Sequence, residues 1–274
     1  MTLPSNSAAV FAVIAMSPFL VVAEEARTAS SNEPAFSASR PGNTESPIAV
    51  PKGYFQVESG IVSYTNDKID DVRYSSLGLA QTAFRYGIAE GTDLQLIVQP
   101  YSRVTSRGAG NDTTYQGFGG VTLRVLHTFM GADGSNPAFG LIGFVTPPIV
   151  SKQLRVSGSA SDRVEGGIIA TGSTNLTDKM NITLTLGDAA RRRNDSYVGD
   201  IFGGANLGYA VTERFGAYVE LFSDHTKYSQ TQTTADLGMT YLINPVTQFD
   251  AGVNIGVNHA TADANFFLGL SHRF

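Results

Sequence analysis

Hydrophobic and polar residues alternate with a period of two along most of the chain after Gly53. Successive side chains of a β-strand point to opposite faces, so this period predicts strands with one apolar and one polar face. Turn residues such as Gly, Asn, Asp and Pro separate the alternating stretches. We therefore expect about twelve strands. They cover residues 54–64, 74–88, 92–101, 116–129, 138–147, 164–176, 180–188, 198–211, 215–223, 231–242, 247–258 and 264–274.

The links between these stretches alternate between short and long. The short links are residues 89–91, 131–137, 177–179, 212–214 and 244–246, and the long links are 65–73, 102–115, 148–163, 189–197, 224–230 and 259–263. Outer-membrane barrels have this rhythm because their periplasmic turns are tight and their outward loops are longer. The pattern predicts an all-β fold, an antiparallel transmembrane β-barrel of the bacterial outer-membrane type over residues 53–274. A soluble sandwich would also alternate, but it would not need the rhythm of the links.

Charged residues inside the expected strands avoid the apolar face. Lys or Arg at mid-depth on a lipid-facing strand costs about 2–4 kcal/mol, so these charges are expected to line the lumen. They are Glu58, Arg85, Asp93, Arg124, Glu220, Asp236, Asp250 and Arg273, and the aromatic residues of the same parity are Phe118, Phe202, Tyr218 and Phe222. The charges would either orient polar solutes in a transverse field or pair into a network that braces the barrel. The aromatic rings would either guide an apolar solute or interdigitate with inward glycines.

The first 52 residues differ in composition from the rest. Residues 8–23 are apolar and end in the small residues Val21 and Ala23, which predicts a signal peptide over residues 1–23; an uncleaved membrane anchor is the alternative. Residues 24–52 are rich in Ser, Ala, Pro and Asn without a period, which is typical of a flexible periplasmic arm. Export is therefore expected.

Composition excludes several kinds of protein. The net charge is −5 with 16% charged residues and no basic face, which argues against nucleic acid as a partner. Cysteine is absent, so disulfides, thiolate metal sites, a cysteine nucleophile and a lipoprotein anchor are excluded. No cofactor, metal site or catalytic residue is indicated. An outer-membrane hydrolase would need Ser, His and an acid or amide side by side, and the expected strand order does not bring any of the four His into such a group.

Two blocks of sequence have a distinctive pattern. The first runs from Arg40-Pro-Gly-Asn-Thr to Val57-Glu58-Ser-Gly60, and the second covers Ala235 to Pro245 and the final residues up to Phe274. Both blocks resemble an outer-membrane family of transporters associated with meta-pathway phenol degradation. The resemblance implies a barrel that carries solutes. It also implies that the terminal Arg273-Phe274 is the signal by which the barrel-assembly machinery selects its clients.

We thus expect a protein of the Gram-negative outer membrane, surrounded by lipid and lipopolysaccharide. The main hypothesis is a channel or facilitator for passive transport of small solutes, including hydrophobic or aromatic ones. The alternative is a non-conducting structural or interaction barrel whose bore is filled by the charged network or by the arm. The run Arg191-Arg192-Arg193, in an expected outward link, would contact lipopolysaccharide phosphates or remain solvated.

Overall fold

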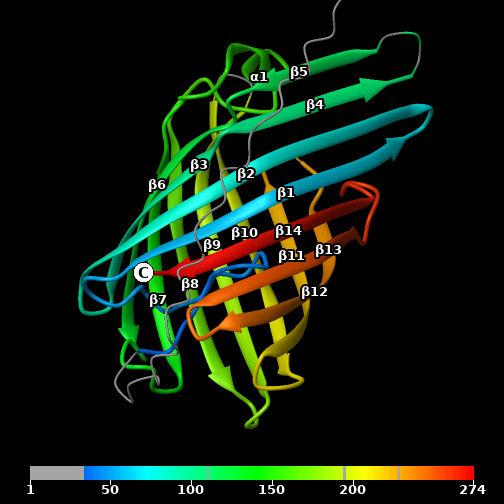
Figure 1. Cartoon of the computed structure of the whole chain (residues 1–274). Coiled ribbons are helices and arrows are strands. Elements are labelled where there is room, and N and C mark those ends of the chain that lie inside the picture. Colours follow the sequence, from blue (N-terminus) through cyan, green and yellow to red (C-terminus); the bar gives the residue numbers. More distant parts are fainter. Residues whose placement is uncertain (1–33, 109, 111, 194–195, 228) are drawn as a thin grey trace, which may run out of the picture. The chain divides into compact units, whose positions relative to one another are not determined.

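Antiparallel strands make up almost all of the computed structural model, which describes residues 34–274 apart from 109, 111, 194–195 and 228 (Figure 1). The strands are β1 (Phe55–Ile69), β2 (Val72–Ala89), β3 (Thr92–Gln99), β4 (Tyr101–Arg107), β5 (Thr113–Gly117), β6 (Gly120–Met130), β7 (Ala138–Thr146), β8 (Glu165–Asn175), β9 (Met180–Arg193), β10 (Ser196–Ala210), β11 (Phe215–Thr226), β12 (Gln232–Asn244), β13 (Thr247–Gly256) and β14 (Ala264–Arg273). A short helix, α1 (Lys152–Val156), lies in the link after β7. Among the described residues, no helix is long and apolar enough to cross a membrane.

The fourteen strand segments form twelve wall strands, because β3 runs on into β4 and β5 runs on into β6. Pro100 lies at the first junction, where it cannot donate a hydrogen bond to the neighbouring strand. The second junction depends on Gly117 and Gly120, whose φ angles of +141° and +128° are rarely adopted by other residues. The wall closes because β1 pairs with both β2 and β14. The predicted antiparallel barrel of about twelve strands is confirmed.

The outer surface of the wall is apolar, as the alternation predicts. On β9, Leu184 and Leu186 are 53% and 63% exposed, whereas Thr185 between them is buried. The same contrast recurs on β3, where Leu94 and Leu96 are exposed and Asp93 and Gln95 are buried. Exposed aliphatic side chains on one face and buried polar ones on the other suit a barrel that meets hydrocarbon outside.

The strict alternation of short and long links is wrong. Only Asp70 and Asp71 separate β1 from β2, and only residues 194–195 separate β9 from β10, although both links were expected to be long. Conversely, the expected short link at 131–137 is among the longer ones. The hydrogen-bonded ladders continue past the apolar belt, so strands end later than the alternation does; the β1–β2 hairpin extends beyond β13 and β14 in Figure 1.

The ladder of β1 is irregular near its middle. Its register with β14 shifts between Gly60 and Val62, and on the facing strand β2 Ala80 has a φ of +56°. The sequence predicts a bulge in the second strand, or an apolar patch in the lumen, because Leu77 and Leu79 share the parity of Arg85. The irregularity involves β2 at Ala80, while the extra residue relative to β14 belongs to β1.

Residues 34–52, here called the inner segment, lie inside the barrel in Figure 1, where they are the blue coil between the strands. This differs from the loosely attached arm that we expected over residues 24–52. Its backbone N–H groups at Ser39, Asn43, Thr44 and Val50 donate to carboxylates of the wall. The segment lacks a period because it is neither a helix nor a strand. Residues 24–33 and the expected signal peptide lie outside the described residues.

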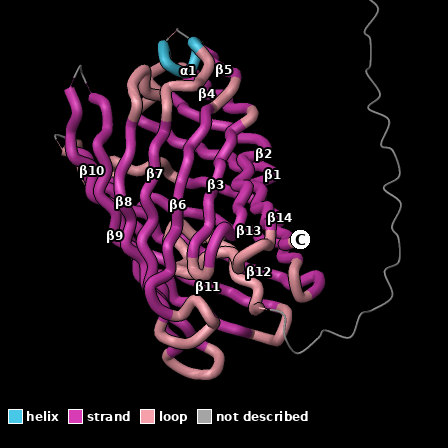
Figure 2. The backbone as a smooth tube through the Cα atoms, turned by 90° about the vertical axis from the view of Figure 1, so that its left-hand side faces the viewer, coloured by secondary structure: helices cyan, strands magenta, loops and turns pink. Residues whose placement is uncertain are grey.

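The small apolar core of the structure also involves the inner segment. Ala49 packs with Leu126 of β6, Ile142 of β7 and Ile169 of β8, and all four are almost fully buried. This contact explains why β7 is apolar on both faces, since one face meets lipid and the other meets the inner segment. The tube view in Figure 2 shows the strands of β6 to β9 side by side over this region.

Candidate functional site: the polar lumen

Carboxylates of the wall hold the inner segment through its backbone. Glu220 of β11 accepts hydrogen bonds from the Asn43 and Thr44 N–H groups at 2.7 and 3.0 Å and from the Thr44 hydroxyl at 2.7 Å. Asp93 of β3 accepts from the Val50 N–H at 2.8 Å, and Glu58 of β1 accepts from the Ser39 N–H at 3.1 Å. Charge-assisted bonds of this kind are stronger than those between neutral groups. The predicted inward acids therefore serve as acceptors for one irregular segment.

Arg85 of β2 lies at the centre of the most buried ion-pair group. Its guanidinium is 2.7 Å from Glu58 Oε1 and 2.6 Å from Asp93 Oδ2, and the three side chains are at most 3% exposed. It also donates to the Ile48 carbonyl of the inner segment at 3.1 Å. Arg85 thus joins three consecutive wall strands and orders the two carboxylates that bind the segment.

Arg40 joins the inner segment to β13 of the wall. Its Nη2 and Nε atoms donate to the two oxygens of Asp250 on β13, at 2.8 and 3.2 Å. The guanidinium lies against Gly60 and Gly269, a directly paired couple on β1 and β14. A Cβ at Gly269 would come within 2.3 Å of Arg40 Nη2, so this slot requires the absence of a side chain.

Glu220 and Asp236 face each other across β11 and β12, and neither makes a salt bridge to a Lys or Arg of the part of the chain that the structure describes. Asn43 bridges the two, because its side-chain amide donates to Asp236 Oδ2 at 2.8 Å while its N–H binds Glu220. A Cβ on Gly42 would lie 2.6 Å from Glu220 Oε2, so glycine is needed for this close approach. Four of the five residues in the Arg40-Pro-Gly-Asn-Thr block, all except the proline, therefore make specific contacts with the inner wall.

The remaining predicted charges also contact the inner segment. Arg124 of β6 is 2.7 Å from Glu45, and Arg273 of β14 donates to the carbonyls of Pro34 and Ala35 at 2.6 and 3.0 Å. Phe274, the expected assembly signal, is 67% exposed at the rim, and its N–H donates to the Phe55 carbonyl at 2.7 Å. We call this end of the barrel, with the turns after β2, β8, β10 and β12, the C-terminal rim.

The four predicted lumen aromatics do not form one row. Phe202 and Phe222 have ring centroids 6.4 Å apart and lie over Gly187 and Gly204, while Tyr218 lies over Gly238. This arrangement is the interdigitation of large and small residues that was one of the two expectations. Phe118 lies at the junction of β5 and β6, in a different part of the wall, where its carbonyl accepts from Ser151 N–H.

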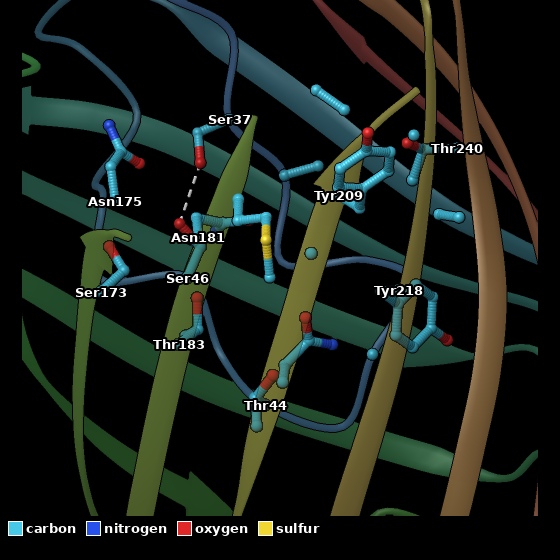
Figure 3. Close-up of a pocket in the computed structure, with 18 of the residues that line it drawn as sticks. Ser37, Thr44, Ser46, Ser173, Asn175, Asn181, Thr183, Tyr209, Tyr218 and Thr240 are labelled. Carbon is cyan, nitrogen blue, oxygen red and sulfur yellow. Dashed lines mark hydrogen bonds between the residues drawn. The ribbon is translucent and has the colours of Figure 1, made fainter. Parts of the chain in front are cut away.

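Two cavities lie in the lumen, and both are lined by Ser39, Arg40 and Gly42. The larger, called the rim cavity and drawn in Figure 3, has a volume of about 430 Å³. Its lining includes Asp178 and Lys179 in the turn after β8. The smaller, called the central cavity, has a volume of about 160 Å³ and is lined by side chains such as Arg85 and Arg124. The inner segment thus forms the partition between the two.

A third cavity, of about 480 Å³, lies near the opposite ends of β8 to β12. Arg191 lines it and binds Asp200 at 2.9 Å and Glu165 at 3.4 Å. Arg191 therefore lies beside acids of the barrel mouth, where its guanidinium is already paired. Among the described residues, no group of three or more potential ligands could hold a metal ion.

Sequence reasoning identified the inward carboxylates and guanidinium groups of the strands but missed their partners. Arg40, Asn43, Thr44 and Glu45 lie in the stretch assigned to a flexible arm. The only available signal was the block Arg40 to Thr44, which was used for family resemblance and not for binding. An unperiodic segment reveals its position only through its tertiary contacts.

Several solved outer-membrane barrels are similar to this chain in structure. An outer membrane channel from Pseudomonas putida F1 is similar over 85% of this chain and 99% of its own length, with a TM-score of 0.62 and 16% identity. The NanC porin (TM-score 0.48, 11% identity, 80% of this chain and 98% of its own) and the CymD monoaromatic hydrocarbon channel (TM-score 0.44, 7% identity, 82% and 88%) are more distant. No curated protein matches the sequence.

The first of these structures has the same fold, a closed barrel of the outer-membrane type. With its apolar outer wall and polar interior, the chain is a β-barrel protein of the Gram-negative outer membrane. The model of the family described as "Putative MetA-pathway of phenol degradation" matches residues 38–274, which include most of the inner segment and the whole wall. The chain belongs to this family.

Proposed function

We propose that the protein is a passive channel for small solutes across the outer membrane. The observation that carries the proposal is the pair of lumen cavities, which meet at Ser39, Arg40 and Gly42 inside a closed polar wall. A solute that follows this route would pass only a short partition of irregular chain. The fold shared with the Pseudomonas putida F1 outer membrane channel supports the proposal. The small central cavity limits the route to small molecules.

The second candidate is a non-conducting barrel that has a structural or interaction role. The observation in its favour is the number of polar bonds between the inner segment and the wall, which extend from Pro34 near Arg273 to Val50 near Asp93. A segment held throughout its length would close the bore permanently.

Planar-bilayer recordings of the purified full-length protein distinguish these candidates. We expect stepwise openings for the unmodified protein and longer or larger openings for the variant Glu220→Gln/Asp250→Gln, because neutral amides hold the segment less strongly than carboxylates. Glu90→Gln, in an exposed turn, is the matched control and should not change the openings. Electrically silent insertion of both the unmodified protein and the double variant, together with no flux of a small uncharged solute through either, would exclude the channel.

We also propose that the protein is not an enzyme. Three His side chains each bond a Thr hydroxyl; the pairs are His127 with Thr92, His225 with Thr231, and His272 with Thr247. A hydrolase would place His beside both a Ser nucleophile and an acid or amide. Detection of ester or phospholipid hydrolysis that is lost in a His variant would overturn this proposal.

Contacts outside the barrel are proposed on general grounds. The exposed Phe274 next to Arg273 is the expected signal for the barrel-assembly machinery, and the apolar wall is suited to lipid. Arg191 is paired inside the mouth, so a lipopolysaccharide contact would depend on other residues of the outward links. Nucleic acid is not proposed as a partner.

A further inference from the structure

We propose that the rim cavity binds uncharged, hydrogen-bonding solutes, such as polyols, in preference to ions. The proposal rests on the proposed channel function and names the class of solute that the channel favours. It is carried by a difference between the two sides of the inner segment. The charged groups of the lumen are paired with each other or with the segment, whereas several neutral polar side chains of the rim cavity make no hydrogen bond to another described residue.

The neutral groups come from strands β8, β9 and β12 and face one space. Ser173 on β8 and Asn181 and Thr183 on β9 line the rim cavity, as does Thr240 on β12 (Figure 3). Register pairs Ser173 with Thr183, so these two hydroxyls lie beside each other. Their side chains make no hydrogen bond to another described residue, which leaves donors and acceptors available for a solute or for water.

Tyr218 adds a group of another kind to the same wall. Its side chain lines the rim cavity, is only 8% exposed and lies flat over Gly238. Its hydroxyl has no hydrogen-bond partner among the described residues. A buried hydroxyl without a partner is costly, so a water molecule or a solute hydroxyl at this position is favoured.

Charges near the rim cavity offer little to an ion. Arg40 is already bound by both oxygens of Asp250, and Glu220 is saturated by Asn43, Thr44 and Asn206. Asp178 and Lys179 at the rim carry opposite charges, so their electric fields largely cancel for an ion that is not in contact with either. An ion that leaves water for this cavity would therefore lose hydration without gaining a partner of opposite charge.

The size of the rim cavity fits a small molecule. Its volume of about 430 Å³ lies within the range of about 300–1,000 Å³ that is typical of small-molecule sites. The central cavity beyond the partition is smaller and contains Arg85, Arg124 and Glu58. Selection by hydrogen bonding is therefore expected in the rim cavity, before the partition.

The test measures tracer flux through the full-length protein in liposomes at low solute concentration. Glucose, gluconate and glucosamine share a six-carbon skeleton and differ in charge. We expect glucose to cross about tenfold faster than either ion, since the ions must give up hydration. Equal rates for glucose and for gluconate or glucosamine would overturn the proposal.

A variant tests the residues themselves. Asn181→Leu/Thr183→Val removes two uncommitted hydrogen-bonding groups and should lower glucose flux about fivefold while KCl conductance stays within the range of the unmodified protein. Thr174→Val, on the opposite face of β8, is the matched control. Heat-modifiable electrophoretic mobility verifies that each barrel is folded.

The outcomes separate the two proposals. An unchanged glucose flux in Asn181→Leu/Thr183→Val would reject the rim cavity as the selecting site, even if the channel conducts. An absence of flux for all three probes, also in Glu220→Gln/Asp250→Gln, would reject the channel function itself and the solute class with it.

Discussion

Arg85 and Arg40 both bind carboxylates inside the barrel, but they join different parts of the chain. Arg85 is 1% exposed and connects β2 to β1 and β3 through Glu58 and Asp93. Arg40 is 20% exposed and connects the inner segment to β13 through Asp250. The comparison teaches that one charged network braces the wall while the other holds the inner segment against it. The ion pairs of Arg85 correspond to the expected bracing network, whereas the attachment of the inner segment through Arg40 was not expected from the sequence.

The largest effect is expected for Arg85→Gln. The substitution leaves Glu58 and Asp93 buried without their cation, which should lower the free energy of unfolding by about 3–5 kcal/mol. The chain contains no tryptophan for fluorescence. Urea unfolding of the barrel in lipid, followed by far-ultraviolet circular dichroism, measures this loss. A stability close to that of the unmodified protein would mean that Arg85 does not brace the wall.

A smaller loss of stability but a larger change in gating is expected for Arg40→Gln. Removing the two charge-assisted bonds to Asp250 weakens attachment of the inner segment by about 2 kcal/mol, which corresponds to roughly a 30-fold shift towards the detached state. Single-channel open probability reports the shift. Arg103→Gln, on an exposed position of β4, is the control, and an equal response of both variants would contradict a specific role of Arg40.

Gly269→Ala should act on the same contact without removing a charge. The added Cβ would overlap the Arg40 guanidinium, so Arg40 must leave its slot and the open probability should rise, although less than for Arg40→Gln. Gly143→Ala is a matched control, because a Cβ there meets nothing within 4 Å. If both alanine variants gate alike, the slot between Gly60 and Gly269 has no part in holding the segment.

Salt should produce the smallest effect. The Debye length falls from about 10 Å at 0.1 M to about 3 Å at 1 M salt, and partly exposed pairs are screened more than buried ones. The pair of Arg40 with Asp250 should therefore weaken in 1 M KCl, with a rise in open probability, while urea stability set by Arg85 changes little. An open probability that is independent of salt would argue that Arg40 is as well shielded as Arg85.

Much of the wall was predictable from sequence, because each strand is defined locally. The parity of Glu220 and Asp236 follows from Leu221 and Leu237 beside them, which must face lipid. Strand ends were less predictable: beyond the apolar belt both faces are polar, as at Asp67 and Lys68, and only backbone pairing continues the ladder.

The partners of the lumen charges could not be predicted for a different reason. Parity places Glu220 inside the barrel, but nothing in its neighbourhood in the sequence indicates that Asn43 and Thr44 donate to it from 177 and 176 residues away. The same holds for Arg124 and Glu45. Contacts between a regular wall and an irregular segment depend on three-dimensional fit, and a one-dimensional pattern does not contain it.

The hydrogen bond from Arg273 to Ala35 joins residues that are 238 positions apart, and Arg273 belongs to the last strand of the wall. The beginning of the inner segment therefore gains this contact only when β14 is in place. Asp250 on β13 imposes the same condition on Arg40. The first residues of the segment are thus fully held only when the last two strands are in place, and a chain truncated before β13 would lack the partners of Arg40 and of the Ala35 carbonyl.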